Sequence, residues 1–155
     1  MKIRIISFGT FKNGDPYREI FEEYRKRIGW PVELIEMKNM SNFSSVDEQI
    51  LRESEKLLST IGTNNKNYRL IVLDERGENL TTADFARVCQ NFIEDGGGID
   101  FILGGSHGLS DSVRNRADLL LSFGKMVHPH KMIRIMLMEQ IYRIYSISKN
   151  HPYHR

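Results

Sequence analysis

The stretch Leu70-Ile71-Val72-Leu73 is entirely apolar and is followed by Asp74. A strand that is apolar on both of its faces is typical of a parallel sheet with helices packed on both sides. Runs of β-branched and other apolar residues elsewhere predict further strands, at residues 3–8, 32–37, 99–103 and 119–123. The stretch at 70–73 therefore predicts a strand of a largely parallel sheet that is covered on both faces.

Helical spacing of apolar residues predicts helices between these strands. Asp15-Pro16 supplies a cap and a proline at the first helical position before a helix that runs to about Ile28. Ser45 and Glu48 form a capping box for a helix that Gly62 ends. Its inward residues are expected to be Val46, Ile50, Leu51, Leu57, Leu58 and Ile61. Further helices are predicted at 82–95, 111–116 and 131–148, so strand–helix alternation indicates a single α/β domain over residues 1–155, a largely parallel sheet flanked by helices.

Composition excludes several classes of protein. The 155 residues are 40% hydrophobic and 27% charged, which excludes disorder, collagen and coiled coil. The one cysteine, Cys89, lies on an apolar helical stripe, which indicates core packing and a reducing, cytoplasmic environment. Charges interrupt every hydrophobic stretch, and the first residues do not resemble a signal peptide. We therefore expect no membrane partner.

The charges are segregated along the chain. The total of 22 Lys and Arg against 20 Asp and Glu leaves a formal net charge of only +2. Residues 125–155, however, contain six basic side chains and one acidic side chain, Glu139, together with four of the five histidines. A basic, histidine-rich C-terminal segment on a mildly acidic body indicates an anionic partner.

The last predicted helix has more apolar residues than one buried stripe requires. Two interpretations remain open: a central helix buried within the monomer, or a helix whose second face mediates self-association, to which methionines are well suited. The apolar residues are Met132, Ile133, Ile135, Met136, Leu137, Met138, Ile141, Ile144, Tyr145 and Ile147.

Three loops follow predicted strands, and ligands of parallel sheets bind beyond the carboxyl ends of strands. The loops begin after Leu73, Leu103 and Phe123. The second contains Gly104, Gly105 and Gly108 in a spacing that matches neither the dinucleotide fingerprint nor a Walker loop. These glycines fit a close approach to a ligand or a structural turn equally well.

The histidines and the C-terminal tail allow several interpretations. His128, His130, His151 and His154 lack Cys or Glu partners at familiar spacings, so no metal site is predicted. Ser106, His107 and Asp111 do not form a convincing catalytic triad, because no nucleophile elbow surrounds the serine. Residues 150–155 are either a solvated basic tail or a functional one, in which Tyr153 stacks and His154 and Arg155 contact phosphate or exchange protons.

Taken together, these segments resemble a known family. The strings Phe-Ile-Leu-Gly-Gly-Ser-His-Gly-Leu at 101–109 and Leu-Ser-Phe-Gly-Lys-Met at 121–126, with Pro129-His130 and the terminal Tyr153-His154-Arg155, look like the RlmH family. Members of that family are SPOUT-class methyltransferases that methylate N3 of a pseudouridine in large-subunit (23S) ribosomal RNA. The resemblance covers the whole chain.

The resemblance implies a C-terminal trefoil knot (the SPOUT, or alpha/beta-knot, fold), a homodimer, and S-adenosylmethionine as cofactor. It also implies that the substrate is ribosomal RNA in the assembled ribosome, that no DNA or metal is involved, and that the tail at 150–155 completes the active site of the partner subunit. The positions implied to bind the cofactor are Leu73, Gly104, Phe123, Gly124, Lys125, Met126, Val127 and His128.

Methyl transfer to a ring nitrogen requires loss of its proton and in-line alignment with the methyl donor. His130 and His154 are the candidate bases, Tyr153 is a candidate stacking residue, and Arg134, Arg143 and Arg155 are candidates to stabilise developing negative charge. For Arg134 and Arg143 an ordinary helix-surface charge is the alternative. A non-enzymatic RNA-binding module and a methyltransferase of the same fold acting on another RNA are the competing functions.

Overall fold

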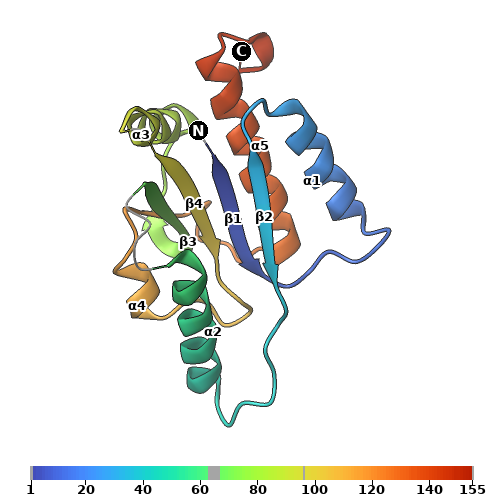
Figure 1. Ribbon diagram of the computed structural model, residues 1–155, viewed down its shortest axis with the longest axis vertical. Helices are drawn as coiled ribbons and strands as arrows, with labels where there is room; N and C mark the ends of the chain where they lie inside the picture. The colour runs from blue at the N-terminus through green and yellow to red at the C-terminus, as the bar shows by residue number, and fades with distance from the viewer. Residues whose placement is uncertain (1, 63–66, 96, 155) are drawn as a thin grey trace.

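A five-stranded sheet, all parallel, forms the centre of the protein (Figure 1). The computed structural model describes residues 2–62, 67–95 and 97–154, and at residue 154 it describes the backbone only. The strand order is β2-β1-β4-β3-β5. The strands are β1 (Ile3–Phe8), β2 (Val32–Met37), β3 (Tyr68–Glu78), β4 (Gly98–Leu103) and β5 (Leu119–Leu121). The parallel α/β sheet predicted from residues 70–73 is thus confirmed.

Helices cover both faces of this sheet. One face packs against α1 (Pro16–Arg27), α3 (Thr82–Glu94) and α5 (His130–Ser148), and the other against α2 (Val46–Ile61) and the short α4 (Asp111–Arg114). Successive strand residues alternate between the two cores: in β1, Ile5 packs with the first group of helices and Ile6 with the second, and both are fully buried. Burial on both faces explains why the stretch 70–73 of β3 is apolar without interruption. A single 3-10 turn, η1 (Pro152–His154), follows α5.

Side-chain caps fix where the first two helices begin. The carboxylate of Asp15 accepts a hydrogen bond from the Tyr17 amide at 3.1 Å, and Ser45 Oγ accepts one from the Glu48 amide at 3.1 Å. The reciprocal half of the expected capping box is shifted by one residue, because Glu48 accepts from the amide of Ser44. Gly62 ends α2 with a φ of 80°, a conformation that favours glycine.

The expected inward face of α2 is wrong at two positions. Val46 and Leu51 are 50% and 51% exposed, whereas Glu53 and Ser54 are buried. The first turns of α2 extend past the carboxyl ends of the strands, where no sheet lies beneath them (Figure 1). Burial therefore begins only where the helix reaches the sheet and its loops.

Cys89 is buried in α3, and burial raises the pKa of its thiol to about 12, as expected for a core cysteine. Across the part of the chain that is described, no helix combines the length and apolar content needed to cross a membrane. The trefoil knot implied by the family resemblance stays a prediction.

Candidate active site

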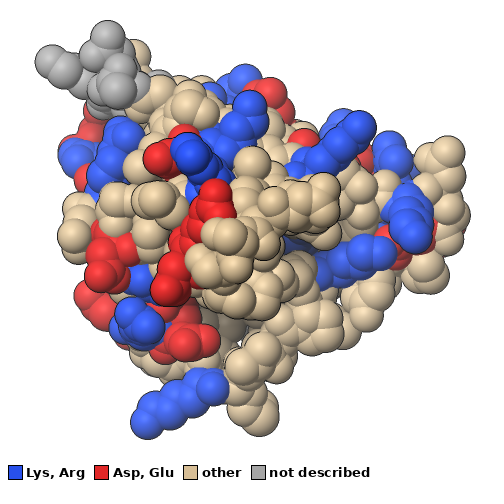
Figure 2. Space-filling model, turned by 90° about the horizontal axis from the view of Figure 1, so that it is seen from below, with Lys and Arg blue, Asp and Glu red and all other residues tan. Residues whose placement is uncertain are grey.

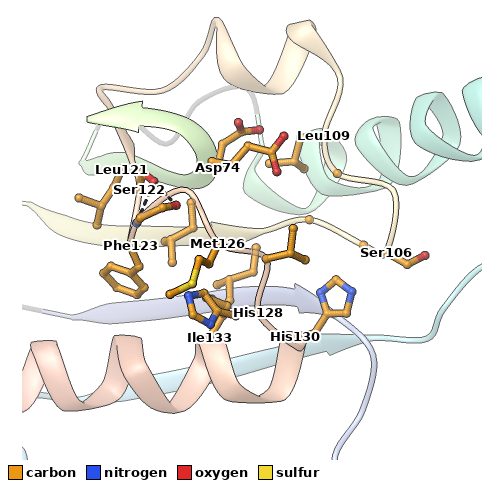
Figure 3. A pocket seen from close by; sticks show the side chains of 18 residues that line it. Asp74, Ser106, Leu109, Leu121, Ser122, Phe123, Met126, His128, His130 and Ile133 are labelled. Atoms are coloured by element: carbon orange, nitrogen blue, oxygen red, sulfur yellow. Dashed lines mark hydrogen bonds between the residues drawn. The ribbon is translucent and has the colours of Figure 1, made fainter. Parts of the chain in front are cut away.

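A pocket of about 210 Å³ lies at the carboxyl ends of β4 and β5, beside the middle of β3 (Figure 3). Leu103 and Leu121, the last residues of β4 and β5, line it with the loops that follow and the first turn of α5, and so does Leu73, the last residue of β3 that pairs with β4. The loop predicted directly after Leu73 is wrong, because β3 continues to Glu78 past a break in its register. Phe123 and Leu121 lie at one end of the pocket in Figure 3, and His130 and Ser106 at the other. This is the position at which parallel sheets bind ligands.

Most of the residues implied to bind the cofactor converge on this pocket. Those that line it are Leu73, Gly104, Phe123, Gly124, Met126, Val127 and His128. Lys125 does not line it, and its side chain is exposed. Met126 and Val127 are also unusually exposed for apolar residues, at 77% and 89%. This loop therefore presents apolar surface that no other described residue covers.

The loop after β5 is held by a serine. Ser122 Oγ accepts a hydrogen bond from the Gly124 amide at 3.1 Å, and the Ser122 hydroxyl lies 3.0 Å from the Gly124 carbonyl, to which it donates. The Asn79 amide group donates to the Ser122 carbonyl at 3.1 Å. Gly124 has a φ of 119°, which a side chain would strain, and the space beside it is open. A tight turn thus forms one wall of the pocket.

The glycines after β4 form a structural turn, one of the two purposes that the sequence left open, and the approach to a ligand stays a prediction. A Cβ at Gly104 would lie 2.8 Å from Leu109 Cγ, so the loop can close on itself only with glycine there. Gly108, at a φ of 85°, donates its amide hydrogen to the Gly105 carbonyl at 3.2 Å. This structural turn is at the same time a wall of the pocket, since Gly104, Gly105 and Gly108 all line it.

Asp74, another lining residue, is neutralised by an arginine. Its carboxylate accepts a hydrogen bond from Arg114 Nε at 2.7 Å and another from the amide of Arg76 at 3.0 Å. The Asp74 side chain is 6% exposed. Its negative charge is therefore balanced within the chain, and the ion pair joins α4 to β3.

His130 is the first residue of α5 and a lining residue of the pocket. Desolvation of its imidazole lowers the pKa of His130 from its ordinary value, and the positive charge of Arg134 lowers it further, while Glu53 acts in the opposite direction. A lowered pKa leaves the ring neutral at pH 7. His130 is therefore able to accept a proton there.

Arg134 lies on α5 one turn beyond His130 but does not line the pocket. Its side chain is 1% exposed, and it donates to Glu36 Oε1 at 3.0 Å, to the Gly9 carbonyl at 2.7 Å and to the Phe8 carbonyl. Burial lowers the pKa of this guanidinium, although Glu36 opposes the effect. The geometry assigns Arg134 to joining α5 to the ends of β1 and β2 rather than to contact with a substrate.

Arg143 and Tyr153 form a second cluster at the far end of α5. Both Arg143 and the Tyr153 hydroxyl donate to Glu139 Oε1, the latter at 3.4 Å, and the Tyr153 ring packs 4.6 Å from that of Tyr142, centre to centre. Arg143 is thirteen residues beyond His130, which corresponds to roughly 20 Å along a helix. Within one chain, the candidate catalytic residues thus divide into two separate groups. The side chain of His154 and all of Arg155 lie outside the described residues.

Glu53 is a residue near the pocket that sequence reasoning missed. It is buried in α2 with its carboxylate against Gly105, and the neighbouring Ser54 Oγ accepts a hydrogen bond from the Ser110 amide at 3.1 Å. The available signal was its spacing: Glu53 lies four residues before Leu57 and eight before Ile61, on the inward stripe of the helix.

In the described residues, no group of three or more His, Cys, Asp or Glu is placed to hold a metal ion.

Comparisons with known proteins agree with this fold. The family model described as "Predicted SPOUT methyltransferase" matches residues 1–154. Ribosomal RNA large subunit methyltransferase H of Rhodospirillum centenum is 41% identical, with 100% of this chain and 99% of the relative covered. The protein of the same name from Chromobacterium violaceum is 42% identical, with the same coverage.

Solved structures show the same fold at low sequence identity. A probable methyltransferase from Bordetella pertussis Tohama I matches with a TM-score of 0.57 and 12% identity, over 92% of this chain and 93% of that chain. A probable methylase family protein from Haemophilus influenzae Rd KW20 matches with a TM-score of 0.51 and 12% identity, over 99% of this chain and 70% of that chain. The resemblance noted in the sequence is confirmed: the chain belongs to the SPOUT methyltransferase family, among the members named ribosomal RNA large subunit methyltransferase H.

Proposed function

We propose that this protein transfers a methyl group from S-adenosylmethionine to N3 of a pseudouridine in 23S ribosomal RNA, on the assembled ribosome in the cytoplasm. The observation that carries the proposal is the pocket at the ends of β4 and β5, lined by seven of the eight residues that the family resemblance assigns to the cofactor. Full-length relatives at 41% and 42% identity are named for methylation of large-subunit ribosomal RNA.

The residues present fit this cofactor. Leu103, Leu109 and Leu121 are buried side chains that form an apolar lining suited to a purine ring. Gly104 and Gly124 line the pocket without side chains, which lets a purine and a ribose approach the backbone closely. The chemistry that the cofactor supplies is a methyl group on a positively charged sulfur.

A homodimer is part of the proposal, because one chain supplies only a portion of the site. The pocket of about 210 Å³ is smaller than the roughly 300–1,000 Å³ of typical small-molecule sites. A second groove of about 440 Å³ lies beside it, lined by Tyr24, Phe123, Ile135 and Met136 among others. This uncovered apolar surface of α5 favours the self-association interpretation of that helix. A partner bound there would bring its own tail toward the pocket.

The proposed chemistry divides between the two groups of residues. His130, neutral at pH 7, accepts the N3 proton of the uracil-type ring. Arg143 of the partner chain stabilises the negative charge that develops on the ring, and Tyr153, with His154 and Arg155 of the same tail, positions the nucleotide. Arg134 supports the first turn of α5, where His130 lies.

The surface around the pocket is compatible with RNA. Figure 2 views the end of the molecule where the strands terminate: Lys and Arg side chains lie above and to the right of a largely uncharged central area, and Asp and Glu border it on the left. Lys125, exposed in the pocket loop, is suited to a phosphate contact. Binding through such contacts weakens as salt concentration rises.

A single transfer experiment tests the proposed function. Purified protein is incubated with methyl-labelled S-adenosylmethionine and with ribosomes that lack the modification, and large-subunit RNA is then digested and its nucleosides separated. Label in N3-methylpseudouridine is the expected result. Label in another nucleoside would indicate a different RNA target, and absence of label together with absence of calorimetric binding of S-adenosylmethionine would indicate an RNA-binding module instead.

A further inference from the structure

The carboxylate of Glu53 is a buried charge with incomplete pairing. The residue is 2% exposed, and its Oε1 atom accepts one hydrogen bond, from the side-chain amide of Gln49 at 2.9 Å. Its Oε2 atom is buried and has no hydrogen-bond partner within the described residues. Burying an anion without a counter-ion costs folding free energy, so a buried charge of this kind is expected where it has a functional role.

Glu53 lies directly behind a wall of the pocket. A Cβ atom placed on Gly105, which lines the pocket, would lie 3.0 Å from Glu53 Cδ and closer still to its unpaired oxygen. The negative charge of Glu53 also reaches the ring of His130, the lining residue at the same end of the pocket as Ser106 (Figure 3). Ser54 attaches α2 to the same glycine loop through the Ser110 amide, so helix and loop hold one another in place.

The other charges near this pocket are balanced or screened. Asp74 is paired with Arg114 at 2.7 Å, and Arg134 is paired with Glu36 at 3.0 Å. Glu75, a lining residue, is exposed to solvent, which weakens its field. Among the described residues around the pocket, Glu53 therefore contributes a buried negative charge that no ion pair compensates.

We propose that Glu53 gives the pocket its preference for a positively charged ligand, and that its carboxylate is the electrostatic recognition element for the cationic methionine portion of the cofactor. This inference rests on the proposed function. S-adenosylmethionine carries a sulfonium and an ammonium group, whereas 5′-methylthioadenosine keeps the nucleoside and the sulfur but carries neither charge. Glu53 acts through space across Gly105 and is a positioning residue, not a catalytic one. An anion in a water-poor wall strengthens binding of a nearby cation by about tenfold.

The test compares ligands of different charge by calorimetry. The ligands are S-adenosylmethionine, S-adenosylhomocysteine, which retains only the ammonium group as a cation, and 5′-methylthioadenosine. The proteins are the unaltered chain, Glu53→Gln, Glu53→Asp and, as matched control, Glu55→Gln on the exposed side of the same helix, where the glutamate pairs with Arg52 and is 54% exposed.

Glu53→Gln is expected to weaken S-adenosylmethionine binding about tenfold and to leave 5′-methylthioadenosine binding within twofold. Glu53→Asp, which keeps the charge, should restore most of the preference, and Glu55→Gln should change neither ligand. The proposal is supported if Glu53→Gln loses more affinity for S-adenosylmethionine than for 5′-methylthioadenosine. The affinity for S-adenosylhomocysteine then shows which of the two positive charges is recognised.

An equal loss for all three ligands, or no loss for any, overturns the proposal. Thermal unfolding of the ligand-free proteins separates this result from a folding defect, because removing a poorly compensated buried charge should leave Glu53→Gln at least as stable as the unaltered chain. Failure of the proposed function looks different: the unaltered protein itself would then bind no S-adenosylmethionine or would transfer no methyl group to ribosomes, and the Glu53 proposal would fall with it.

Discussion

The guanidinium carbon of Arg143 lies 5.1 Å from the centre of the Tyr153 ring, in a cation–π contact that joins the C-terminal tail to the last turns of α5. Hydrogen bonding to Glu139 raises the pKa of Arg143, so the group is fully charged at any pH of interest. The tail is thus placed by its own chain at a point remote from that chain's pocket. In the proposed homodimer, this position would leave the tail available to the partner subunit.

Replacing Arg143 with alanine should reduce the methylation rate without affecting cofactor binding. Loss of one group that stabilises developing charge typically lowers kcat by about 100- to 1,000-fold. Single-turnover kinetics on ribosomes measures this loss, and calorimetry should show S-adenosylmethionine affinity within twofold of the unaltered protein. Arg87→Ala, at an α3 side chain that is 77% exposed, is the matched control. An Arg143→Ala variant that keeps its rate would remove Arg143 from the mechanism.

The lowered pKa of His130 predicts a specific pH dependence. If its neutral ring accepts the proton, kcat/KM should rise with pH through an apparent pKa below 6.5 and then stay level through neutral pH. His130→Ala should lower the rate and abolish this rise, whereas His107→Ala, at an exposed position outside the pocket lining, should preserve it. A rise that persists in His130→Ala would assign the proton to another group.

The same shift affects stability, with a definite sign. Between the lowered pKa in the folded protein and the ordinary pKa of the unfolded chain, the unfolded state binds more protons at His130 than the folded state. The free energy of unfolding should therefore fall as pH falls through the window below about 6.5. Urea denaturation of the unaltered protein and of His130→Ala across pH 5–7 should show a shallower pH dependence in the variant.

Arg134→Met should destabilise the protein more than it affects chemistry. The substitution leaves Glu36 and the carbonyls of Phe8 and Gly9 without their charged donor, and breaking a buried pair of this kind costs about 3–5 kcal/mol. Urea denaturation measures the loss, and Arg52→Met at an exposed ion pair on α2 should change stability by less than about 1 kcal/mol. Equal stability of the two variants would mean that Arg134 is free for another role.

These two arginines show how far sequence could predict the site. Arg134 and Arg143 lie on one helix, carry the same charge and were equally good candidates for contact with the substrate. Only packing distinguishes them: the first is 1% exposed and bound to β1 and β2, the second is 30% exposed beside the tail. Side-chain spacing determines the face of a helix, but it does not reveal which loops close over that face.

The fold was more accessible than the site. Uninterrupted apolar runs such as Leu70-Ile71-Val72-Leu73 predict parallel strands, and caps at Asp15 and Ser45 predict where helices begin. The strand order is not contained in local patterns, because alternation of strands and helices is compatible with many crossovers. Glu53 was missed for a related reason, since a charged residue on an apolar stripe is interpreted as exposed until the loop that covers it is known.

Gly105→Ala should destabilise the loop against Glu53 in a way that a second substitution relieves. The added methyl group would meet the Glu53 carboxylate, and overpacking of this kind costs about 1–3 kcal/mol. In the double variant with Glu53→Ala, the total loss of folding free energy should be smaller than the sum of the two single-variant losses, by roughly 0.5 kcal/mol or more. Urea denaturation of all four proteins gives the coupling, and strict additivity would contradict the contact.

Mixed dimers should test whether the tail serves the partner subunit. One variant lacks residues 150–155, and the other carries Gly104→Trp, which disrupts the pocket wall because even a Cβ there would lie 2.8 Å from Leu109 Cγ. Each variant alone should be inactive. In a mixed dimer, the intact pocket of the tail-deleted chain receives the intact tail of the other chain, so one of its two sites is complete.

Random mixing at equal concentration gives half mixed dimers, so about one quarter of the unaltered activity should return. Two different affinity tags, used in sequence, isolate the mixed dimers and confirm that they formed. If each tail instead served its own chain, the tail-deleted subunit would lack its tail and the other subunit would lack its pocket, so purified mixed dimers would remain inactive. Recovery of activity therefore requires that the pocket of one chain and the tail of the other form a single site.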